Sequence, residues 1–451
     1  MSTVPSVTDQ SFIDRAPLTR FHLKLTAFSA GGPLLDGYAV TIIGLALITL
    51  GPALDLDSTE IGLAAAAALA GILVGGLVFG RLTDRIGRKV MYIANLIALS
   101  VVSVLSALVT DTWQLVVLRF VLGVMIGADY PIASSLLAEF VPSRYRGRLL
   151  GALFAAFGLG AALAAGTGWL LSSTGDDAWR WMLASPAVIG VVTLVLRLSA
   201  PESPRWLLSR GRRAEAEKIA HEIWGRHVEL NELVEPPVEA TEALLNRTSI
   251  RRIAYVSIFF IAHVVPLFAI YSFGPALMHR IGIGTDSPYL PEVVIALLFV
   301  VGSVPGLWLV DRVGRIPLLT VTFVIMAAAF AVVALFPDAP PAALFAALAV
   351  YALASGASNF IEIIVPNELF PTAVRATATG IVVAISRIGA VASTFLLPTI
   401  LTDWGTGAVM WLLAGVNLAG LIGTVLLGEE SRNRALVASA AIDPAPAGQH
   451  L

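Results

Sequence analysis

The fold is decided by a five-residue segment that occurs twice, as Asp84-Arg85-Ile86-Gly87-Arg88 and as Asp311-Arg312-Val313-Gly314-Arg315, 227 residues apart. Two weaker pairs follow in the same order at offsets of 229 and 228 residues: Glu139, Pro142 and Arg146 with Glu368, Pro371 and Arg375, and Glu202-Ser203 with Glu430-Ser431. Matching order and nearly constant spacing indicate that the two halves of the chain are copies of one structural unit, arranged in parallel.

The composition indicates a membrane protein. Of 451 residues, 57% are hydrophobic and only 13% are charged, whereas a soluble domain usually carries about 25% charged residues. The chain contains no cysteine, which excludes disulfides and cysteine-ligated metals, and we expect neither a metal nor a cofactor. The net charge of -2 argues against a nucleic-acid partner. Duplicated apolar halves are typical of transporters, whose solute site lies between the repeats.

Twelve stretches stay apolar over the roughly 20 residues that a helix needs to cross a bilayer. They lie at about 23–50, 60–80, 90–110, 113–140, 147–172, 180–199, 253–278, 290–310, 316–336, 340–365, 377–400 and 406–428. Six fall in each repeat. The sequence therefore predicts an all-α membrane protein with 12 transmembrane helices, in two six-helix bundles related by pseudo-twofold symmetry.

The polar segments predict the domain organisation and the orientation. We expect a cytoplasmic N-terminal tail at 1–22, a bundle at 23–199, a cytoplasmic linker at 200–252, a second bundle at 253–430 and a cytoplasmic, disordered tail at 431–451. Within the linker, a helix is predicted near residues 212–224. Loops after even-numbered spans are basic and the opposite loops are mainly acidic, so both termini are predicted to be cytoplasmic in a multi-pass protein of the plasma (inner) membrane.

Two loop segments carry a resemblance to a known family. One is Gly80-Arg81-Leu82-Thr83-Asp84-Arg85-Ile86-Gly87-Arg88-Lys89, which resembles the signature loop of the major facilitator superfamily between spans two and three. The other is Pro201-Glu202-Ser203-Pro204-Arg205-Trp206-Leu207, which resembles the sugar-porter branch and its metabolite:proton relatives. The resemblance covers essentially all of the spans and implies the two-bundle fold of that superfamily, with spans one and seven lining a central cavity.

Finer features are similar to aromatic-acid and phosphate proton symporters. They are Asp36-Gly37-Tyr38 in span one, Gly127-Ala128-Asp129-Tyr130-Pro131 in span four, and Asn359, which matches a substrate-contacting position of that group. Several positions depart from the pattern. Ala39 stands where sugar porters have an acid that carries the proton, Phe157 replaces a Gln, and Phe259 and His263 replace a Trp and an Asp. Because the side chains that would bind phosphate are replaced, the resemblance argues against phosphate as the substrate.

A proton-coupled carrier needs ionisable side chains at membrane depth, where unpaired charges are costly. The residues predicted to serve proton coupling are Asp36, Arg119, Asp129 and His263. Asp36 and His263 are 227 residues apart, so the repeat predicts equivalent positions in spans one and seven. A protonated Asp36 would release Arg119. Two alternatives stay open: a purely structural pair of Asp36 with Arg119, and a neutral His263 bonded to a backbone carbonyl.

Polar positions in the same central spans are predicted to bind the substrate. They are Tyr38, Asp129, Tyr130, His263, Asn359 and Glu362. The offset of 229 sets residues 129–130 opposite residues 358–359, which predicts a polar patch suited to a solute with hydroxyl or carboxyl groups. The alternatives are hydrogen bonds that join helices to one another and a pair of Glu362 with Arg387.

Charged residues that repeat at the predicted cytoplasmic ends have a separate predicted role, as latches that hold one conformation and break during transport. These are Asp84, Arg88, Glu139, Arg146, Glu202, Arg205, Asp311, Arg315, Glu368 and Arg375. Glu139 is expected to act with Arg146, and Glu368 with Arg375. Such latches must contribute only roughly a few kcal/mol, since both conformations have to stay populated.

These features predict a proton-driven symporter that imports a small polar metabolite by alternating access, with organic acids ahead of sugars or polyols. The expected partners are the solute, protons and the lipid bilayer, and a monomer suffices. The alternatives are a proton-coupled exporter of hydrophobic compounds and a nutrient sensor that transports nothing. An enzyme is not expected, because no nucleophile–base pair or metal cluster is evident. Without a Gly-rich phosphate loop, ATP would not drive transport directly.

Overall fold

The computed structural model describes residues 17–198, 201–224, 246–284, 289–370 and 372–431. Within these ranges the secondary structure is helical and contains no strand. The α-helices are α2 (Arg20–Ala53), α3 (Ser58–Ile86), α4 (Arg88–Ser106), α5 (Thr112–Phe140), α6 (Ser143–Leu171), α7 (Ala178–Ala184), α8 (Pro186–Arg197), α9 (Pro204–Ser209), α10 (Arg213–Trp224), α12 (Arg247–Arg280), α13 (Leu290–Val313), α14 (Arg315–Leu335), α15 (Pro341–Asn359), α16 (Ile361–Leu369), α17 (Thr372–Asp403) and α18 (Gly405–Leu427).

The membrane spans agree with the sequence prediction. In the described ranges, 12 helical stretches are long and apolar enough to cross a bilayer, and each overlaps one predicted span. Two spans are interrupted. The sixth is divided into α7 and α8 at Ser185, where Pro186 has no backbone N–H to continue the helical ladder. The tenth is divided into α15 and α16 at Phe360.

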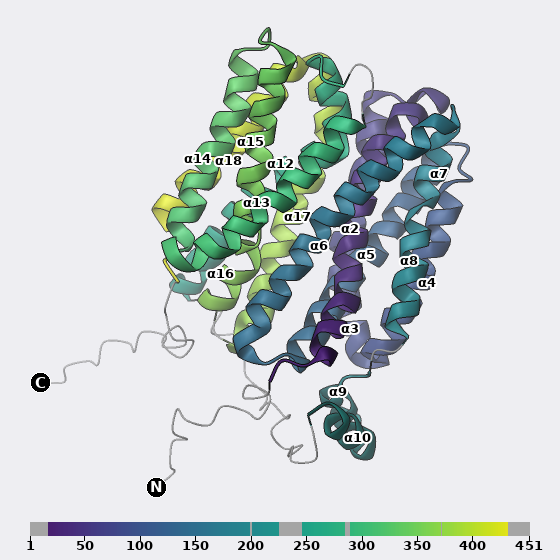
Figure 1. Cartoon of the computed structure of the whole chain (residues 1–451), viewed down its shortest axis with the longest axis vertical. Helices are drawn as coiled ribbons and strands as arrows, with labels where there is room; N and C mark the ends of the chain where they lie inside the picture. The colour runs from purple at the N-terminus through teal and green to yellow at the C-terminus, as the bar shows by residue number, and fades with distance from the viewer. Residues whose placement is uncertain (1–16, 199–200, 225–245, 285–288, 371, 432–451) are drawn as a thin grey trace, which may run out of the picture. The chain divides into compact units, whose positions relative to one another are not determined.

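The described chain forms two compact units, which are considered separately. Unit 1 comprises Met1–Pro237, Tyr271–Ala276 and Asp286–Ala296, and unit 2 comprises Val238–Ile270, Leu277–Thr285 and Leu297–Leu451. In unit 1, α3 packs along α5 and α2 along α6 (Figure 1). In unit 2, α14 packs against α15 and α18. The predicted linker helix is present as α10, and the two terminal tails fall largely outside the described residues.

Glycines bring the same helix pairs into close contact in both units. A Cβ atom added to Gly127 on α5 would lie 2.2 Å from the carbonyl oxygen of Ile72 on α3. In unit 2, a Cβ atom on Gly356 of α15 would lie 2.0 Å from the carbonyl oxygen of Phe299 on α13. Small residues let membrane helices approach until their backbones touch. These contacts stand at equivalent places in the two repeats, so the duplication extends to the packing.

Candidate functional site

Unit 1 contains a buried ion pair that joins two membrane helices. Asp129 on α5 and Arg197 at the end of α8 are 4% and 0% exposed. The Arg197 Nη1 donates to Asp129 Oδ1, and Nη2 donates to Oδ2 at 2.9 Å. Both carboxylate oxygens therefore have a charged donor. A bidentate arrangement is the strongest form of this interaction and fixes the relative orientation of the two side chains.

The surroundings of Arg197 are shaped to hold it. Its Nε donates to the carbonyl oxygen of Phe28 on α2 at 3.0 Å, and its guanidinium lies 3.5 Å from the ring centroid of Tyr92 on α4. Gly32 on α2 leaves the space that the pair occupies, because a Cβ atom there would lie 1.6 Å from Asp129 Oδ2. Four helices therefore meet at one charge pair, which indicates a structural role for Asp129 in the conformation described.

The other predicted residues of unit 1 lie on α2 and α5. Asp36 is half-buried on α2. Two residues further along, the Tyr38 hydroxyl donates to Ser185 Oγ at 2.7 Å, at the interruption between α7 and α8. Arg119 is 2% exposed, and its Nη1 donates to the carbonyl oxygen of Ala39 at 3.2 Å. Its Nε has no hydrogen-bond partner among the described residues. Arg119 thus contacts the α2 backbone close to Asp36.

Unit 2 places His263 in a saturated hydrogen-bond network. Its Nδ1 lies 3.2 Å from the carbonyl oxygen of Phe259, and its Nε2 lies 2.8 Å from Ser358 Oγ on α15. A carbonyl can only accept, so in a neutral imidazole we assign the proton to Nδ1, and Nε2 accepts from the Ser358 hydroxyl, whose single proton has the Ala354 carbonyl oxygen, at 3.2 Å, as its alternative acceptor. The ring also packs 4.7 Å from the Phe323 ring, centroid to centroid. This geometry matches the structural alternative for His263, with both nitrogens occupied.

Next to Ser358, several polar atoms of unit 2 lack a partner among the described residues. Asn359 and Glu362 are 4% and 7% exposed, and Asn359 Oδ1 and Glu362 Oε1 make no hydrogen bond there. Arg387 on α17 is close enough for its charge to act on Glu362. Its Nε is also unpartnered within the same ranges, and its guanidinium lies 5.1 Å from the Phe268 ring centroid. Two buried acceptors without a described partner, beside a half-buried guanidinium with an unpartnered Nε, are suited to a polar ligand.

Charged residues brace the end of unit 2 at which the repeated loop lies. Arg315 pairs with both carboxylate oxygens of Glu368, at 3.0 and 2.7 Å, and Ser431 Oγ donates to Glu368 Oε2. The Glu430 carboxylate accepts from the backbone N–H groups of Arg315 and Ile316, at 3.1 and 3.0 Å. It therefore caps the N-terminus of α14, where the helix dipole favours a negative charge.

The equivalent helix start in unit 1 has the same construction. The backbone N–H of Lys89 donates to Glu202 Oε2 at 3.1 Å. Both helices begin after a glycine with positive φ, 110° at Gly87 and 106° at Gly314. A Cβ atom on Gly314 would also lie 2.8 Å from Glu430 Oε2, so the repeated Gly allows both the backbone turn and the close carboxylate. The predicted equivalence of Glu202 and Glu430 thus has a structural basis.

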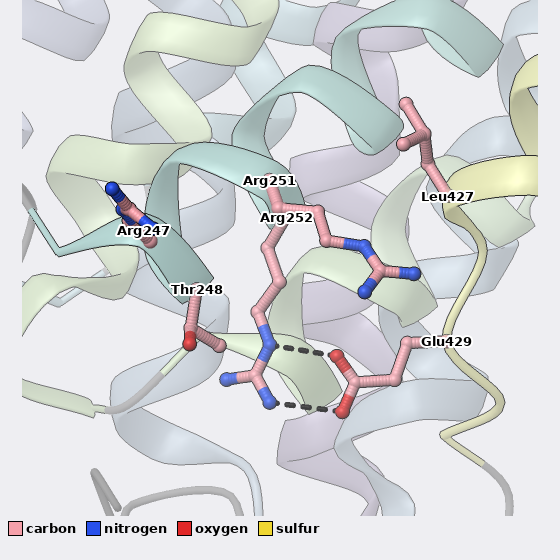
Figure 2. Close-up of a pocket in the computed structure, with 6 residues that line it drawn as sticks. All are labelled: Arg247, Thr248, Arg251, Arg252, Leu427 and Glu429. Atoms are coloured by element: carbon pink, nitrogen blue, oxygen red, sulfur yellow. Dashed lines mark hydrogen bonds and ion pairs between the residues drawn. The ribbon is translucent and has the colours of Figure 1, made fainter.

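A further ion pair of unit 2 lies in the wall of an open pocket of about 370 Å³, which is lined by Arg247, Thr248, Arg251, Arg252, Leu427 and Glu429. Figure 2 shows Arg252 facing Glu429 with two parallel hydrogen bonds, of 2.9 and 3.0 Å. Arg252 also donates to the carbonyl oxygen of Leu369, so the first turns of α12 are tied to α16 and to the segment after α18. None of the residues that line this pocket is among those predicted to bind the substrate.

Several predicted residues cannot be placed at the level of side chains. The side chains of Asp84, Arg88, Tyr130, Glu139, Arg146, Arg205, Asp311 and Arg375 lie outside the described part of the structure. The expected pairing of Glu368 with Arg375 is therefore untested, and the described residues that bind Glu368 are Arg315 and Ser431. Among the described residues, no group of His, Asp or Glu could hold a metal ion.

The sequence analysis did not single out two charged residues that the structure makes prominent, Arg197 and Glu292. Both are fully buried, although they lie near the ends of predicted spans. The available signal was a charge inside the predicted ranges 180–199 and 290–310. Charged side chains near the ends of membrane spans usually reach water or lipid headgroups, whereas these two are fully buried.

Comparison with known proteins decides the family. The model of the sugar (and other) transporter family matches residues 25–440. The chain belongs to this family. It is 36% identical over 428 residues to the inner membrane metabolite transport protein YgcS of Escherichia coli (strain K12), which covers 95% of this chain and 96% of that protein. It is 26% identical over 446 residues to the arabinose-proton symporter of Bacillus subtilis (strain 168), covering 93% and 96%.

A solved structure shows the same fold. The xylose transporter XylE from E. coli, in a partially occluded inward open conformation, matches with a TM-score of 0.80 at 21% identity, over 92% of this chain and 100% of that chain. The chain is thus a multi-pass membrane protein with the major facilitator fold, in the sugar-porter branch. It is a sugar or metabolite transporter and not an enzyme.

Proposed function

We propose that the protein is a proton-coupled symporter that imports a small polar metabolite, with organic acids as the first candidates. The observation that carries the proposal is the set of buried, unpartnered polar atoms in unit 2, Asn359 Oδ1, Glu362 Oε1 and Arg387 Nε, among the described residues. A buried polar group without a partner costs free energy, which a ligand that supplies the missing hydrogen bonds recovers.

The chemistry of these atoms favours a solute with both a carboxylate and a hydroxyl group. Arg387 supplies N–H donors in a planar fork that suits a carboxylate. Asn359 Oδ1 accepts from a hydroxyl, and Glu362 accepts when ionised or donates when protonated. In the proposed mechanism, unit 1 contributes through α2 and α5, which carry Asp36 and Arg119.

Proton coupling is assigned to Asp36 in this proposal. It is a half-buried acid in the middle of α2, and Arg119 reaches the α2 backbone three residues away. Protonation of Asp36 would change the electrostatic environment of Arg119 and permit closure around the solute. Asp129 is retained as a secondary candidate, since its two oxygens already meet Arg197.

Sugars are the second candidate substrate class. The curated relative from Bacillus subtilis is named an arabinose-proton symporter, and the solved neighbour is a xylose transporter. The hydrogen-bonding side chains of unit 2 would also suit hydroxyl groups. The guanidinium of Arg387 favours the acid over the sugar, because it offers a full positive charge to the ligand.

The proposal is tested with purified protein in liposomes that contain a pH-sensitive dye. A panel of monocarboxylates, aromatic acids, hexoses and phosphate is added outside, with Asp36→Asn as the comparison variant. Acidification of the lumen by one solute, abolished in Asp36→Asn, is expected and names the substrate class. Tight binding of a solute without any acidification would contradict symport and favour a uniporter or a sensor, and outward movement of hydrophobic compounds would favour the exporter.

A further inference from the structure

An ionisable residue outside the predicted site is buried without a partner. Glu292 lies in the first turn of α13 and is 0% exposed. Neither of its carboxylate oxygens has a hydrogen-bond partner among the described residues, and no ion pair includes it there. Burying an isolated ion costs roughly several kcal/mol of free energy, even after the protein relaxes around it. In the conformation described, the carboxyl group is therefore best accounted for as a neutral acid.

A glycine of α12 leaves the space for the Glu292 carboxyl group. A Cβ atom on Gly274 of α12 would lie 2.3 Å from Glu292 Oε2, so the missing side chain leaves room for the carboxyl group. On either side of Glu292 along the chain, Tyr289 and Val293 pack in an apolar cluster with Ile42 and other residues of unit 1. The carboxyl group is thus enclosed by a surface that offers it no counter-charge.

The fold itself does not require an acid at this place. The repeat offset of 227 sets Ala65, a buried residue of α3, at the position equivalent to Glu292. The first repeat therefore builds the same helix with a methyl group where the second has a carboxyl. A buried, unpaired acid lowers stability relative to an apolar side chain, so the acid in α13 has a cost that packing does not explain and is a candidate for a functional role.

We propose that Glu292 is a second proton-carrying residue of the transport cycle, neutral when enclosed as here and ionised when the start of α13 becomes accessible to water. The proposal rests on the proposed proton symport. By the charge pattern of the loops, this end of α13 faces the outside, from which protons enter during uptake. No described Asp, Glu, Lys, Arg or His side chain pairs with it from α12, α13 or the apolar cluster; the ionisable groups within that cluster are the phenols of Tyr289 and Tyr38.

The protonation state is tested first on the wild type in liposomes with dicyclohexylcarbodiimide, an apolar reagent that labels protonated carboxyl groups. Mass spectrometry identifies the labelled residues. We expect Glu292 to be labelled at acidic pH and progressively less as the pH rises, whereas Asp338, which is exposed, stays unlabelled as an internal control. Absence of label on Glu292 at acidic pH would overturn the proposal without reference to any solute.

The role in coupling is tested with Glu292→Gln and Glu292→Asp, using the solute that acidifies wild-type liposomes. A gradient of one pH unit supports about tenfold accumulation by a one-proton symporter. Glu292→Gln is expected to lose this accumulation but to keep solute exchange at equal pH, which also shows that it is folded, while Glu292→Asp keeps both. Undiminished accumulation by Glu292→Gln would overturn the proposed role of Glu292 and leave the proposed symport intact. A wild type that accumulates nothing overturns the proposed symport, and this role with it.

Discussion

Two buried acids, one in each unit, have opposite surroundings. Asp129 of unit 1 receives a guanidinium nitrogen on each carboxylate oxygen. Glu362 of unit 2 has one oxygen without a partner among the described residues, although Arg387 is close enough to act on it. The first acid has little left to offer a solute, whereas the second can still accept or donate a hydrogen bond. The charge of Asp129 thus serves the architecture of unit 1, whereas Asn359 and Glu362 of unit 2 keep polar atoms available.

The same comparison changes the ranking of the residues that the sequence predicted. Tyr38 donates to Ser185 and both nitrogens of His263 have partners, so these side chains are already engaged. Asn359 Oδ1 and Glu362 Oε1, in contrast, have no hydrogen-bond partner among the described residues. Substrate binding is therefore expected to be most sensitive at Asn359 and Glu362, and stability at Asp129 and its partner.

The largest expected effect comes from breaking the pair in unit 1. Arg197→Ala leaves the Asp129 carboxylate buried without its counter-charge, which is expected to cost about 3–5 kcal/mol. The measurement is thermal unfolding in detergent, followed by circular dichroism, and the variant should melt well below the wild type. An additional Asp129→Asn substitution removes the orphaned charge and should recover part of the loss. Unchanged melting of Arg197→Ala would contradict a structural role for the pair.

A smaller loss is expected from Gly32→Ala, which leaves both charges in place. The added methyl group would overlap Asp129 Oδ2 and force the pair or α2 to move. Overpacking of this kind costs about 1–3 kcal/mol. Gly166→Ala is the matched control, since Gly166 lies on a helix of the same unit and a Cβ atom there meets nothing within 4 Å. Equal melting temperatures for the two variants would show that the space beside Asp129 is unimportant.

In unit 2 the expected loss is of affinity and not of stability. Asn359→Ala removes an acceptor that no described residue uses, so melting should stay unchanged while the acidifying solute binds about 1 kcal/mol, or fivefold, more weakly. Isothermal titration calorimetry supplies the dissociation constant. The control is Asn417→Ala on α18, another buried Asn with an unpartnered Oδ1 in the described ranges. Equal weakening by both substitutions would argue against contact between Asn359 and the solute.

The smallest effect is expected at the start of α10, where the exposed Arg212, just before the helix, donates to both carboxylate oxygens of Glu215, at 2.6 and 2.7 Å. This hydrogen bond lowers the pKa of Glu215 from its ordinary value. Because the folded pKa is the lower one, any stabilisation exists above the unfolded pKa and disappears as the pH falls through the folded pKa. Solvent screening makes exposed ion pairs weak, so Glu215→Gln should have the same melting temperature as the wild type at neutral and at acidic pH. A clear loss at neutral pH would give this linker pair a structural role.

Most of the architecture was predictable because lipid imposes simple rules. Backbone groups in a bilayer must be satisfied within helices, so apolar length alone marked the spans, and the repeated Asp84–Arg88 segment marked the two halves. The matched helix starts after Gly87 and Gly314 lie within this repeated segment. The interruption at Ser185 had a local signal in Pro186, but a proline also occurs inside uninterrupted helices, such as Pro33 in α2.

The partners of buried charges were not predictable from spacing. Arg197 is 68 residues from Asp129 and belongs to no repeated motif. Their ion pair depends on where α5 and α8 pack against each other, which the sequence does not specify. Glu292 was missed for the same reason, because its burial comes from Gly274 and from the helices around the start of α13. The family resemblance identified Asn359, and its place in span ten identified Glu362, as candidates. Only packing distinguishes their unpartnered atoms from the hydrogen-bonded nitrogens of His263.

The central claim is that a proton gradient drives solute into the compartment through this protein. The most direct measurement compares the steady-state concentration of the acidifying solute inside liposomes with an acidic exterior and inside liposomes at equal pH. Symport predicts accumulation above the external concentration only with the gradient, with return to the external concentration when an ionophore dissipates it. Equilibration to the external concentration under both conditions would contradict proton coupling and leave facilitated diffusion.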